Sequence, residues 1–519
     1  MTDTTVTIKA GALSGRRSAD GVVRSFKGIP YARPPVGPLR WAPPQEIAPW
    51  GGTRPAHAFG PRCIQPDRVP TAVGYFGPEP QSEDCLYLNV RTAAVAGDKR
   101  PVMVWLHGGA FTVGSGALPF SDGEALARAG VVLVTVNYRL GRLGFLAHPA
   151  LSAEQPYRAS GNYGLLDQIA ALRWVRDNIA AFGGDPGCVT IFGQSAGSSS
   201  VSTLMASPLA KGLFHQAIGQ SGGAFFARIL QKLDVAERAG AQFAQCLGAK
   251  TIEELRQRPA EQIQLAIPED NLALNRFFDS SFPKGIDRKN GWSIIDGYVV
   301  PDYVMTVFAR GAQNDVPLLS GATADEGSTQ PPTPSIAEFQ QRARADFGEL
   351  AEAYLRLFPA GNEAELEASS RRAVGTRVFN WENWTWANLQ AQTGRAPVYF
   401  YHFAHVPPKP RLPGGGDLSR DIGAFHTAEI PYVFQTLGVR SWPWREIDHE
   451  LSKLMSGYWI NFACCGNPNG AGLPQWPEYD PSTPSTMIFD RGCRIDTVPD
   501  IETLKFWTSV DERFRAQLR

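Results

Sequence analysis

The sequence predicts an α/β protein with a central, mostly parallel β-sheet flanked by helices. Three apolar runs, at residues 85–90, 101–106 and 131–136, lack the polar alternation of half-exposed strands. Such runs are typical of strands that are covered on both faces, as in a parallel sheet. Helical patterns lie between and after them, and this alternation of elements is the second observation that favours the α/β class.

Before these runs, residues 5–8 and 21–26 alternate polar and apolar side chains. This pattern predicts antiparallel strands. Residues 28–37 are rich in Gly and Pro, which indicates a stiff connector, and their apolar content favours a packed loop over a flexible linker.

The clearest helical pattern precedes Gly183 and Gly184, where it stops. Its apolar residues recur at intervals of three and four positions: Leu165, Ile169, Leu172, Val175, Ile179 and Phe182. A β-branched run at 189–192 then predicts a short buried strand, and small residues from 196 onward predict the start of another helix.

Further strands are predicted at 217–221, 316–320 and 398–403. Two long, mainly helical excursions lie near 224–312 and 330–395. No clean linker separates these segments, so residues 1–519 are predicted to form one structural domain.

The chain carries 50 basic and 50 acidic residues, so charge does not favour nucleic acid or an anionic membrane as a partner. No run of about 18 apolar residues is present, so no transmembrane helix is expected. Residues 1–13 lack the basic flank and apolar stretch of a secretory signal. We expect a soluble, cytoplasmic protein, with a processed secreted form as the alternative.

Seven cysteines are too few for a disulfide framework. Cys63 and Cys85 bracket a loop rich in Pro and Gly and are the one pair we would propose. A reducing cytoplasm argues against this disulfide, so both states of the pair stay open.

Residues 193–197 read Gly-Gln-Ser-Ala-Gly, a G-x-S-x-G motif between the predicted strand and helix. In this context the motif indicates a strained turn that pushes the Ser195 hydroxyl clear of the sheet, with glycines where side chains would collide. The helix N-terminus that follows favours developing negative charge. The alternative is a glycine-rich turn that contains a serine by chance.

Residues 107–111, His-Gly-Gly-Ala-Phe, follow the strand that ends at 106. Acyl transfer needs N–H donors aimed at an oxyanion, and a Gly-Gly-small segment lets the backbone approach closely enough to supply them. We assign these donors to the amides of Gly109, Ala110 and Ala196, with Gly108 beside them. A tight turn after a strand is the alternative.

Hydrolases with such a turn supply their acid and base after the serine, in the order Asp or Glu, then His. Residues 321–328 follow a strand and offer Asp325 or Glu326 as the acid. His426 lies among small residues on a loop, which suits a reachable base. His402 and His405 have no further ligands nearby, so no metal site is predicted there.

Together these motifs resemble the type-B carboxylesterase/cholinesterase family, and among its members the bacterial para-nitrobenzyl-esterase-like carboxylesterases. The resemblance runs from about residue 8 to beyond residue 500. It is carried by the serine turn and by the motifs at residues 82–90, 107–111, 161–168 and 182–186.

The resemblance implies an α/β-hydrolase fold and a serine hydrolase that cleaves small-molecule carboxylic esters without a metal or organic cofactor. It assigns the nucleophile to Ser195, the base to His426 and the acid to Glu326 rather than Asp325. An amidase, thioesterase or lactonase with the same residues is the alternative within enzymes. A non-catalytic binding protein is the alternative outside them.

The resemblance also implies features around these residues. Ser221 and Glu429 are expected to form a polar shell near His426. Two ion pairs are expected to be structural, Arg40 with Glu83 and Arg139 with Asp167.

Aromatic residues are the candidates for the substrate pocket. An apolar gorge for aryl or short-to-medium acyl esters is expected from eight aromatic residues: Phe111, Tyr75, Phe76, Phe277, Phe278, Phe282, Trp384 and Phe425. Trp381 and Trp384 share a helical face, and core packing is the favoured alternative for them.

Two departures from the family pattern matter. The loop between residues 63 and 85 contains no tryptophan, so choline specificity is not predicted. The chain ends without an endoplasmic-reticulum retention signal or an oligomerising tail, which is typical of a microbial enzyme. We expect a monomer or a weak homodimer.

Overall fold

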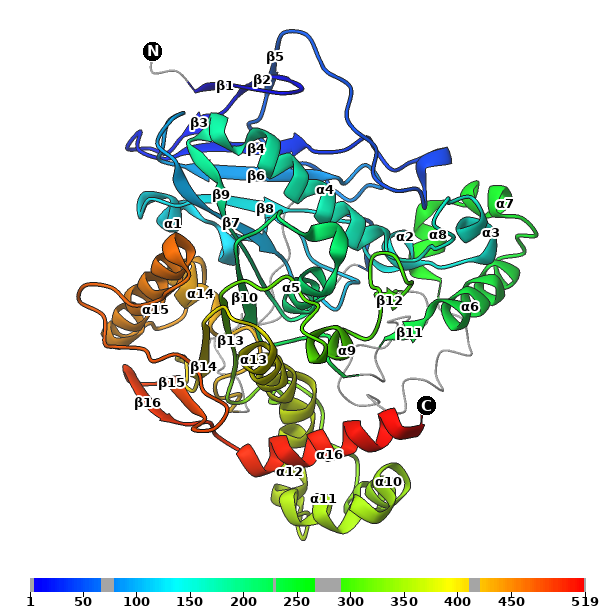
Figure 1. Ribbon diagram of the computed structural model, residues 1–519, viewed down its shortest axis with the longest axis vertical. Coiled ribbons are helices and arrows are strands. Elements are labelled where there is room, and N and C mark those ends of the chain that lie inside the picture. The colour runs from blue at the N-terminus through cyan, green and yellow to red at the C-terminus, as the bar shows by residue number, and fades with distance from the viewer. Residues whose placement is uncertain (1–3, 67–78, 227–229, 267–290, 410–420, 518–519) are drawn as a thin grey trace.

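A computed structural model describes residues 4–66, 79–226, 230–266, 291–409 and 421–517, and its central feature is an eleven-stranded sheet (Figure 1). From one edge to the other, the strands are β16 (Cys493–Thr497), β15 (Ser485–Phe489), β14 (Val398–Phe403), β13 (Leu318–Thr323), β10 (Gln216–Gln220), β9 (Gly184–Gln194), β7 (Arg100–Leu106), β8 (Val132–Val136), β6 (Tyr87–Thr92), β4 (Arg24–Pro30) and β3 (Arg16–Arg17). All pairs from β15 to β8 are parallel, and the pairs at both edges are antiparallel. The predicted α/β class with a mostly parallel sheet is confirmed.

Strand β7 shows why its sequence is an unbroken apolar run. Val102, Val104 and Leu106 belong to the larger hydrophobic cluster, whereas Met103 and Trp105 belong to a second cluster. Because successive side chains of a strand point to opposite faces, the sheet has a core on each side. A strand in this position has no solvent face on which polar residues would alternate.

Different helices cover the two faces (Figure 1). The larger cluster includes side chains of α4 (Tyr163–Asn178), α5 (Ala196–Ala206) and α13 (Trp381–Thr393). The second cluster includes side chains of α14 (Ile430–Val433) and α15 (Glu446–Cys465). The predicted helix before Gly183 corresponds to α4 and the 3₁₀ turn η3 (Ile179–Phe182), and Gly183 caps it with a left-handed φ of 86°.

The two excursions are helical where the structure describes them. The first contains α6 (Leu233–Cys246), α7 (Ile252–Arg256), α8 (Ala260–Leu265) and α9 (Val304–Ala309), with the short strands β11 (Gln231–Lys232) and β12 (Ile294–Ile295). The second contains α10 (Ile336–Phe347), α11 (Ala351–Leu357), α12 (Glu363–Gly375), η8 (Thr376–Asn380) and α13. The remaining helices include α1 (Glu124–Arg128), α2 (Gly141–Phe145), α3 (Pro149–Ala153) and α16 (Ile501–Gln517).

The predicted N-terminal segments contain the antiparallel strands β1 and β4 (Arg24–Pro30), but these strands lie in different sheets. Strand β1 (Thr5–Ile8) pairs with β2 (Gly11–Ser14) in a separate small sheet that β5 (Thr53–Pro55) completes, and it does not pair with residues 21–26. The predicted connector also begins inside β4, which continues to Pro30 along β6. A bulge between Phe26 and Ile29 lets the strand continue through Gly28, whose N–H donates to Asn89 Oδ1 instead of to the ladder.

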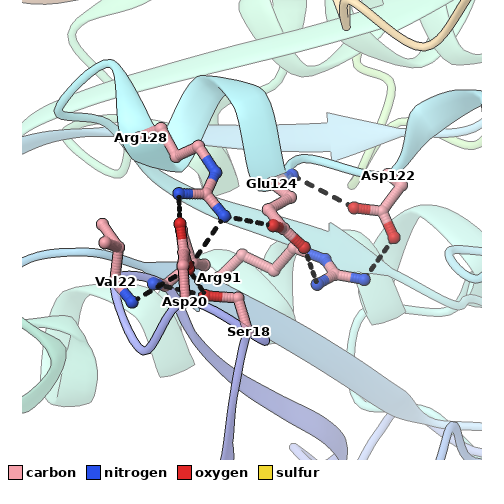
Figure 2. A network of polar contacts seen from close by, with 8 residues as sticks. Ser18, Asp20, Val22, Arg91, Asp122, Glu124 and Arg128 are labelled. Carbon is pink, nitrogen blue, oxygen red and sulfur yellow. Dashed lines mark hydrogen bonds and ion pairs between the residues drawn. The ribbon is translucent and has the colours of Figure 1, made fainter.

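An exposed polar network joins the loop before β4 to α1 and β6 (Figure 2). Arg128 donates to Asp20 and to Glu124 Oε1, the latter at 2.6 Å, and Arg91 of β6 pairs with Asp122. Hydrogen bonding from Arg128 holds the pKa of Asp20 well below its usual range. Because most of these groups face solvent, the network orders the loop and adds little stability.

The two ion pairs implied by the resemblance are confirmed. Arg40 Nε donates to Glu83 Oε1 at 2.6 Å. Arg139 Nη2 lies 2.7 Å from Asp167 Oδ1, and both side chains are almost completely buried. A buried pair of this kind is costly to break, because the remaining charge has no solvent.

Cys63 and Cys85 are both buried thiols in the structure. A hydrogen bond with Cys63, followed by burial, raises the pKa of the Cys85 thiol. In the described ranges, no helix is both long and apolar enough to cross a membrane.

Candidate active site

Ser195 lies on the turn between β9 and α5, as predicted. Its backbone has φ 59° and ψ −124°, a conformation that non-glycine residues rarely adopt, and its N–H donates to Gln220 O at 2.9 Å. A Cβ atom at Gly197 would lie 1.9 Å from Leu106 O, and one at Gly193 would lie 2.5 Å from the Gly197 carbonyl carbon. Glycine at both positions therefore allows the close approach of chains around the serine.

The structure brings Glu326 and His426 together across 100 positions of the sequence. His426 Nδ1 lies 2.5 Å from Glu326 Oε2, and Thr323 N donates to Glu326 Oε1 at 2.8 Å. Glu326 is buried three residues after the end of β13, whereas the His426 side chain keeps 19% of its surface exposed. A buried carboxylate on Nδ1 sets the tautomer in which Nε2 is free to accept a proton.

The carboxylate of Asp325 binds the backbone of Ala424 and not the imidazole of His426. Its Oδ2 accepts a hydrogen bond from Ala424 N at 2.8 Å, and its own N–H donates to Ala424 O at 3.0 Å. Burial raises the pKa of this carboxyl. Asp325 thus holds the loop that carries His426, and Glu326 contacts the imidazole.

Residues 108–111 form a tight turn beside the nucleophile. Gly109, Ala110 and Phe111 all have positive φ, and Gly109 O accepts from Val113 N at 3.0 Å. A Cβ atom at Gly108 would lie 3.1 Å from Ser195 Cβ, so the turn runs directly against the serine. In the described ranges, the N–H groups of Gly109, Ala110 and Ala196 donate to no protein acceptor.

His107, directly before this turn, is fixed by its contacts with Tyr138. Its ring stacks on Tyr138 with a centroid distance of 4.4 Å, and Tyr138 Oη donates to His107 O at 2.6 Å. Burial lowers the pKa of His107 to about 4, so the ring is neutral at pH 7. A neutral imidazole stacked on Tyr138 orients the turn.

Of the two residues expected near His426, Glu429 interacts with the imidazole through its charge. Ser221 follows β10 with a φ of 52°, and Gln220 Nε2 donates to Glu429 Oε1 at 3.1 Å. Burial, followed by the charge of Glu326, raises the pKa of Glu429 to about 7, and His426 opposes this shift. In the part of the chain that the structure describes, Ser221 Oγ and Glu429 Oε2 are buried without a protein partner.

Two contacts of the imidazole were missed in the sequence analysis. Gln194 Nε2 lies 3.2 Å from His426 Nε2 and 3.3 Å from Nδ1, and the Phe379 ring lies 4.2 Å from the imidazole ring. The described hydrogen bonds include none between Ser195 Oγ and His426, so Gln194 is the contact between the serine turn and the base. Its place directly before the serine could have singled it out, whereas Phe379 has no sequence signal.

The predicted pocket aromatics differ in their surroundings. Phe111 is buried and packs edge-on against Phe145 and Trp292. Phe425 is also buried and contacts Trp442. Trp381 is in the core and Trp384 is partly buried against it, as the alternative for this pair predicted. The other candidates, Tyr75, Phe76, Phe277, Phe278 and Phe282, lie outside the described residues.

Of the histidines near the end of β14, His405 has protein partners. Its Nε2 lies 2.6 Å from Asp448 Oδ1, and its Nδ1 lies 2.5 Å from Asp490 O. These contacts tie β14 to α15.

Comparison with known proteins agrees with this arrangement. The model of the carboxylesterase family matches residues 2–507. The chain belongs to the carboxylesterase family. This carboxylesterase is 40% identical to the fumonisin B1 esterase of Sphingopyxis macrogoltabida, over 91% of this chain and 84% of that protein. It is 37% identical to the para-nitrobenzyl esterase of Bacillus subtilis (strain 168), over 97% of this chain and 98% of that protein.

Solved structures agree with the sequence comparison. A PNB esterase structure matches with a TM-score of 0.80 and 34% identity, covering 98% of this chain and 100% of its own. The α/β-hydrolase fold and the type-B carboxylesterase resemblance are therefore confirmed. The carboxylesterase is a carboxylic ester hydrolase that acts on small-molecule esters, and a serine mechanism is general to its family.

Proposed function

We propose that ester cleavage proceeds through an acyl-enzyme on Ser195, with His426 as the base and Glu326 as the acid of the triad. The observation that carries this assignment is the 2.5 Å contact between Glu326 Oε2 and His426 Nδ1. The strained turn of Ser195 supports it, because such a turn exposes a nucleophile at the end of a sheet.

In this mechanism, His426 Nε2 accepts the Ser195 proton as the hydroxyl oxygen attacks the ester carbonyl. Glu326 stabilises the imidazolium that forms. When the tetrahedral intermediate collapses, the alcohol leaves with a proton from His426, and the acyl group stays on the serine. Water then repeats the sequence and releases the acid.

The oxyanion rests on backbone N–H groups in this proposal. The amides of Gly109, Ala110 and Ala196 have no competing protein acceptor in the described ranges, and the turn that carries two of them runs against Ser195. Loss of one such donor typically costs about 10²–10³ in kcat. Gly108 keeps this turn close, and Ser221 and Glu429 surround the base.

We propose aryl and short-to-medium acyl esters as substrates. The buried ring of Phe111 follows the proposed oxyanion donors directly and belongs to an aromatic group with Trp292. Two relatives are named for fumonisin B1 and for para-nitrobenzyl esters, and these names support a preference for esters with large leaving groups. Phe425, on the same loop as His426, is assigned to the other side of the pocket.

Hydrolysis of a para-nitrophenyl ester series by the wild type and by Ser195→Ala tests the proposal. We expect a chain-length optimum for the wild type and a fall on the order of 10⁶-fold for the variant. Ser202→Ala is the matched control, because Ser202 lies on the same helix and its hydroxyl donates to Ser199 O. Retained turnover in a clean Ser195→Ala preparation contradicts the assignment, and faster cleavage of matched anilides favours an amidase.

A further inference from the structure

The loop that follows β10, residues 221–226, packs directly against the backbone of the nucleophile. Ser195 N–H donates to the carbonyl oxygen of Gln220, the last residue of β10 and the one directly before this loop. A Cβ atom at Gly222 would lie 2.6 Å from Ser195 O and 3.2 Å from its Cα. Any shift of this loop therefore displaces the groups that contact the Ser195 backbone.

Asn383 of α13 holds the loop at Gly222. Its Oδ1 accepts from Gly222 N at 2.6 Å, and its Nδ2 donates to Gly219 O at 3.1 Å and to Ser320 Oγ at 2.9 Å. The side chain is completely buried and thus connects α13 with β10 and β13, which lie beside it (Figure 1).

Glu382, the preceding residue, holds the far end of the same loop. Its Oε2 accepts from Phe225 N at 2.7 Å, and its Oε1 accepts from Phe226 N at 3.1 Å. Burial raises the pKa of Glu382 to about 8, so the fold retains a carboxyl group where ionisation is costly. Both oxygens bind backbone amides of the loop behind Ser195.

Helix α5 also holds the loop, through hydrogen bonds from two of its serines. Ser198 Oγ donates to Gly222 O at 2.5 Å, and Ser199 Oγ donates to Gly223 O at 2.7 Å. Because α5 starts directly after Ser195, these serines tie the loop to the helix that carries the nucleophile. The loop is thus held between α5 and α13.

We propose that Glu382 and Asn383 are positioning residues for Ser195, which act through residues 219–226 and keep the nucleophile in its strained conformation. This inference rests on the assignment of Ser195 as the nucleophile. The competing explanation is that both side chains only attach α13 to the sheet. A misplacement of about 1 Å in a reacting group can cost about 10²-fold in rate, so the two explanations differ in kcat.

The chain offers a matched control for this test. Gln390 lies two turns further along α13, is equally buried, and donates to Asp315 Oδ1 at 2.7 Å near the start of β13. In the described ranges, its hydrogen bonds do not involve residues 219–226. Gln390→Ala therefore removes an equivalent attachment of the helix without touching the nucleophile loop.

The experiment measures three quantities for the full-length wild type, Asn383→Ala and Gln390→Ala: kcat and KM with a para-nitrophenyl ester, the rate of phosphonylation of Ser195 by a para-nitrophenyl phosphonate, and the melting temperature. We expect Asn383→Ala to lower kcat and the phosphonylation rate about 10- to 100-fold, with KM within about threefold. Gln390→Ala is expected to lower the melting temperature and to keep kcat.

A second, milder variant covers the case in which Asn383→Ala does not fold. Glu382→Gln has nearly the same shape but keeps one carbonyl acceptor, so we expect an intermediate loss of kcat. The inference is overturned if Asn383→Ala or Glu382→Gln, whichever folds, has the same kcat as Gln390→Ala. Wild-type turnover that survives in Ser195→Ala points instead to a failure of the nucleophile assignment.

Discussion

Replacing Glu326 by Gln separates the two tasks of this carboxylate. One oxygen contacts His426 Nδ1 at 2.5 Å, and the other accepts from Thr323 N at 2.8 Å. A glutamine has a single acceptor oxygen, so one of these contacts must face an amide NH₂ group. If the NH₂ group faces His426, then Nδ1 becomes the acceptor and Nε2 carries the proton. The imidazole is then unable to take the proton from Ser195.

The size of the loss follows from this change of tautomer. In the Ser-His-Asp template the same exchange costs about 10⁴ in kcat, which corresponds to about 5.5 kcal/mol of transition-state stabilisation. The opposite amide orientation sets two donors against each other at Thr323, which costs about 1–3 kcal/mol in a buried site. Because that orientation restores the tautomer but not the charge, we expect a loss of about 10³–10⁴-fold.

The assay is release of para-nitrophenolate at pH 7 by the wild type, Glu326→Gln and Asp325→Asn. Asn keeps an acceptor for Ala424 N, so Asp325→Asn is expected to lose less than about 10-fold, the range of one neutral hydrogen bond. Melting temperatures show whether each variant is folded. A larger loss for Asp325→Asn than for Glu326→Gln, with both variants folded, would refute the reasoning and move the acid to Asp325.

Three further predictions concern charge in and around the site. Gln194→Glu puts a carboxylate about 3 Å from His426, and its charge favours the imidazolium. The acidic limb of the pH profile of kcat/KM should therefore move up by about 1–3 pH units. Gln194→Ala, the control, is not expected to move this limb. Arg139→Met leaves Asp167 buried without its partner, and urea titration should show a loss of about 3–5 kcal/mol in unfolding free energy. Burial raises the pKa of Glu429 to about 7 from its ordinary 4.5, so the folded state keeps a proton that the unfolded state releases, and stability falls as pH rises between these values. Glu429→Gln should remove this fall in melting temperature between pH 5 and pH 8, and an unchanged slope would assign it to other groups.

The fold was predictable where burial leaves a mark on the sequence. Strands β7, β8 and β14 are covered on both faces, and their apolar runs marked them. Strands β2, β3, β15 and β16 were missed. Of these, β3 and β16 are short antiparallel edge strands, which carry mixed residues and have no such run. The bulge in β4 was missed because Gly and Pro near it indicate a break, whereas pairing with β6 carries the strand through.

The candidate site was predictable to a different degree. The serine turn and the 107–111 turn are local, so short motifs were enough to identify both. The residues themselves left Asp325 and Glu326 open as the acid, and the resemblance chose Glu326. The structure places the two carboxyl groups on different partners, Ala424 N and His426, because successive residues after β13 point in different directions.

By itself, the sequence determined the α/β class, the strained turn at Ser195 and the glycines that the turn needs, since backbone geometry and burial act over a few neighbouring residues. Only the tertiary structure decided which distant groups meet. Gln194 lies against His426, and Glu382 and Asn383 hold the loop behind Ser195 from more than 150 positions away. Such contacts depend on the packing of α13 and the His426 loop on the sheet. The sequence alone does not distinguish an Asn or Glu that binds a distant loop from one that faces solvent.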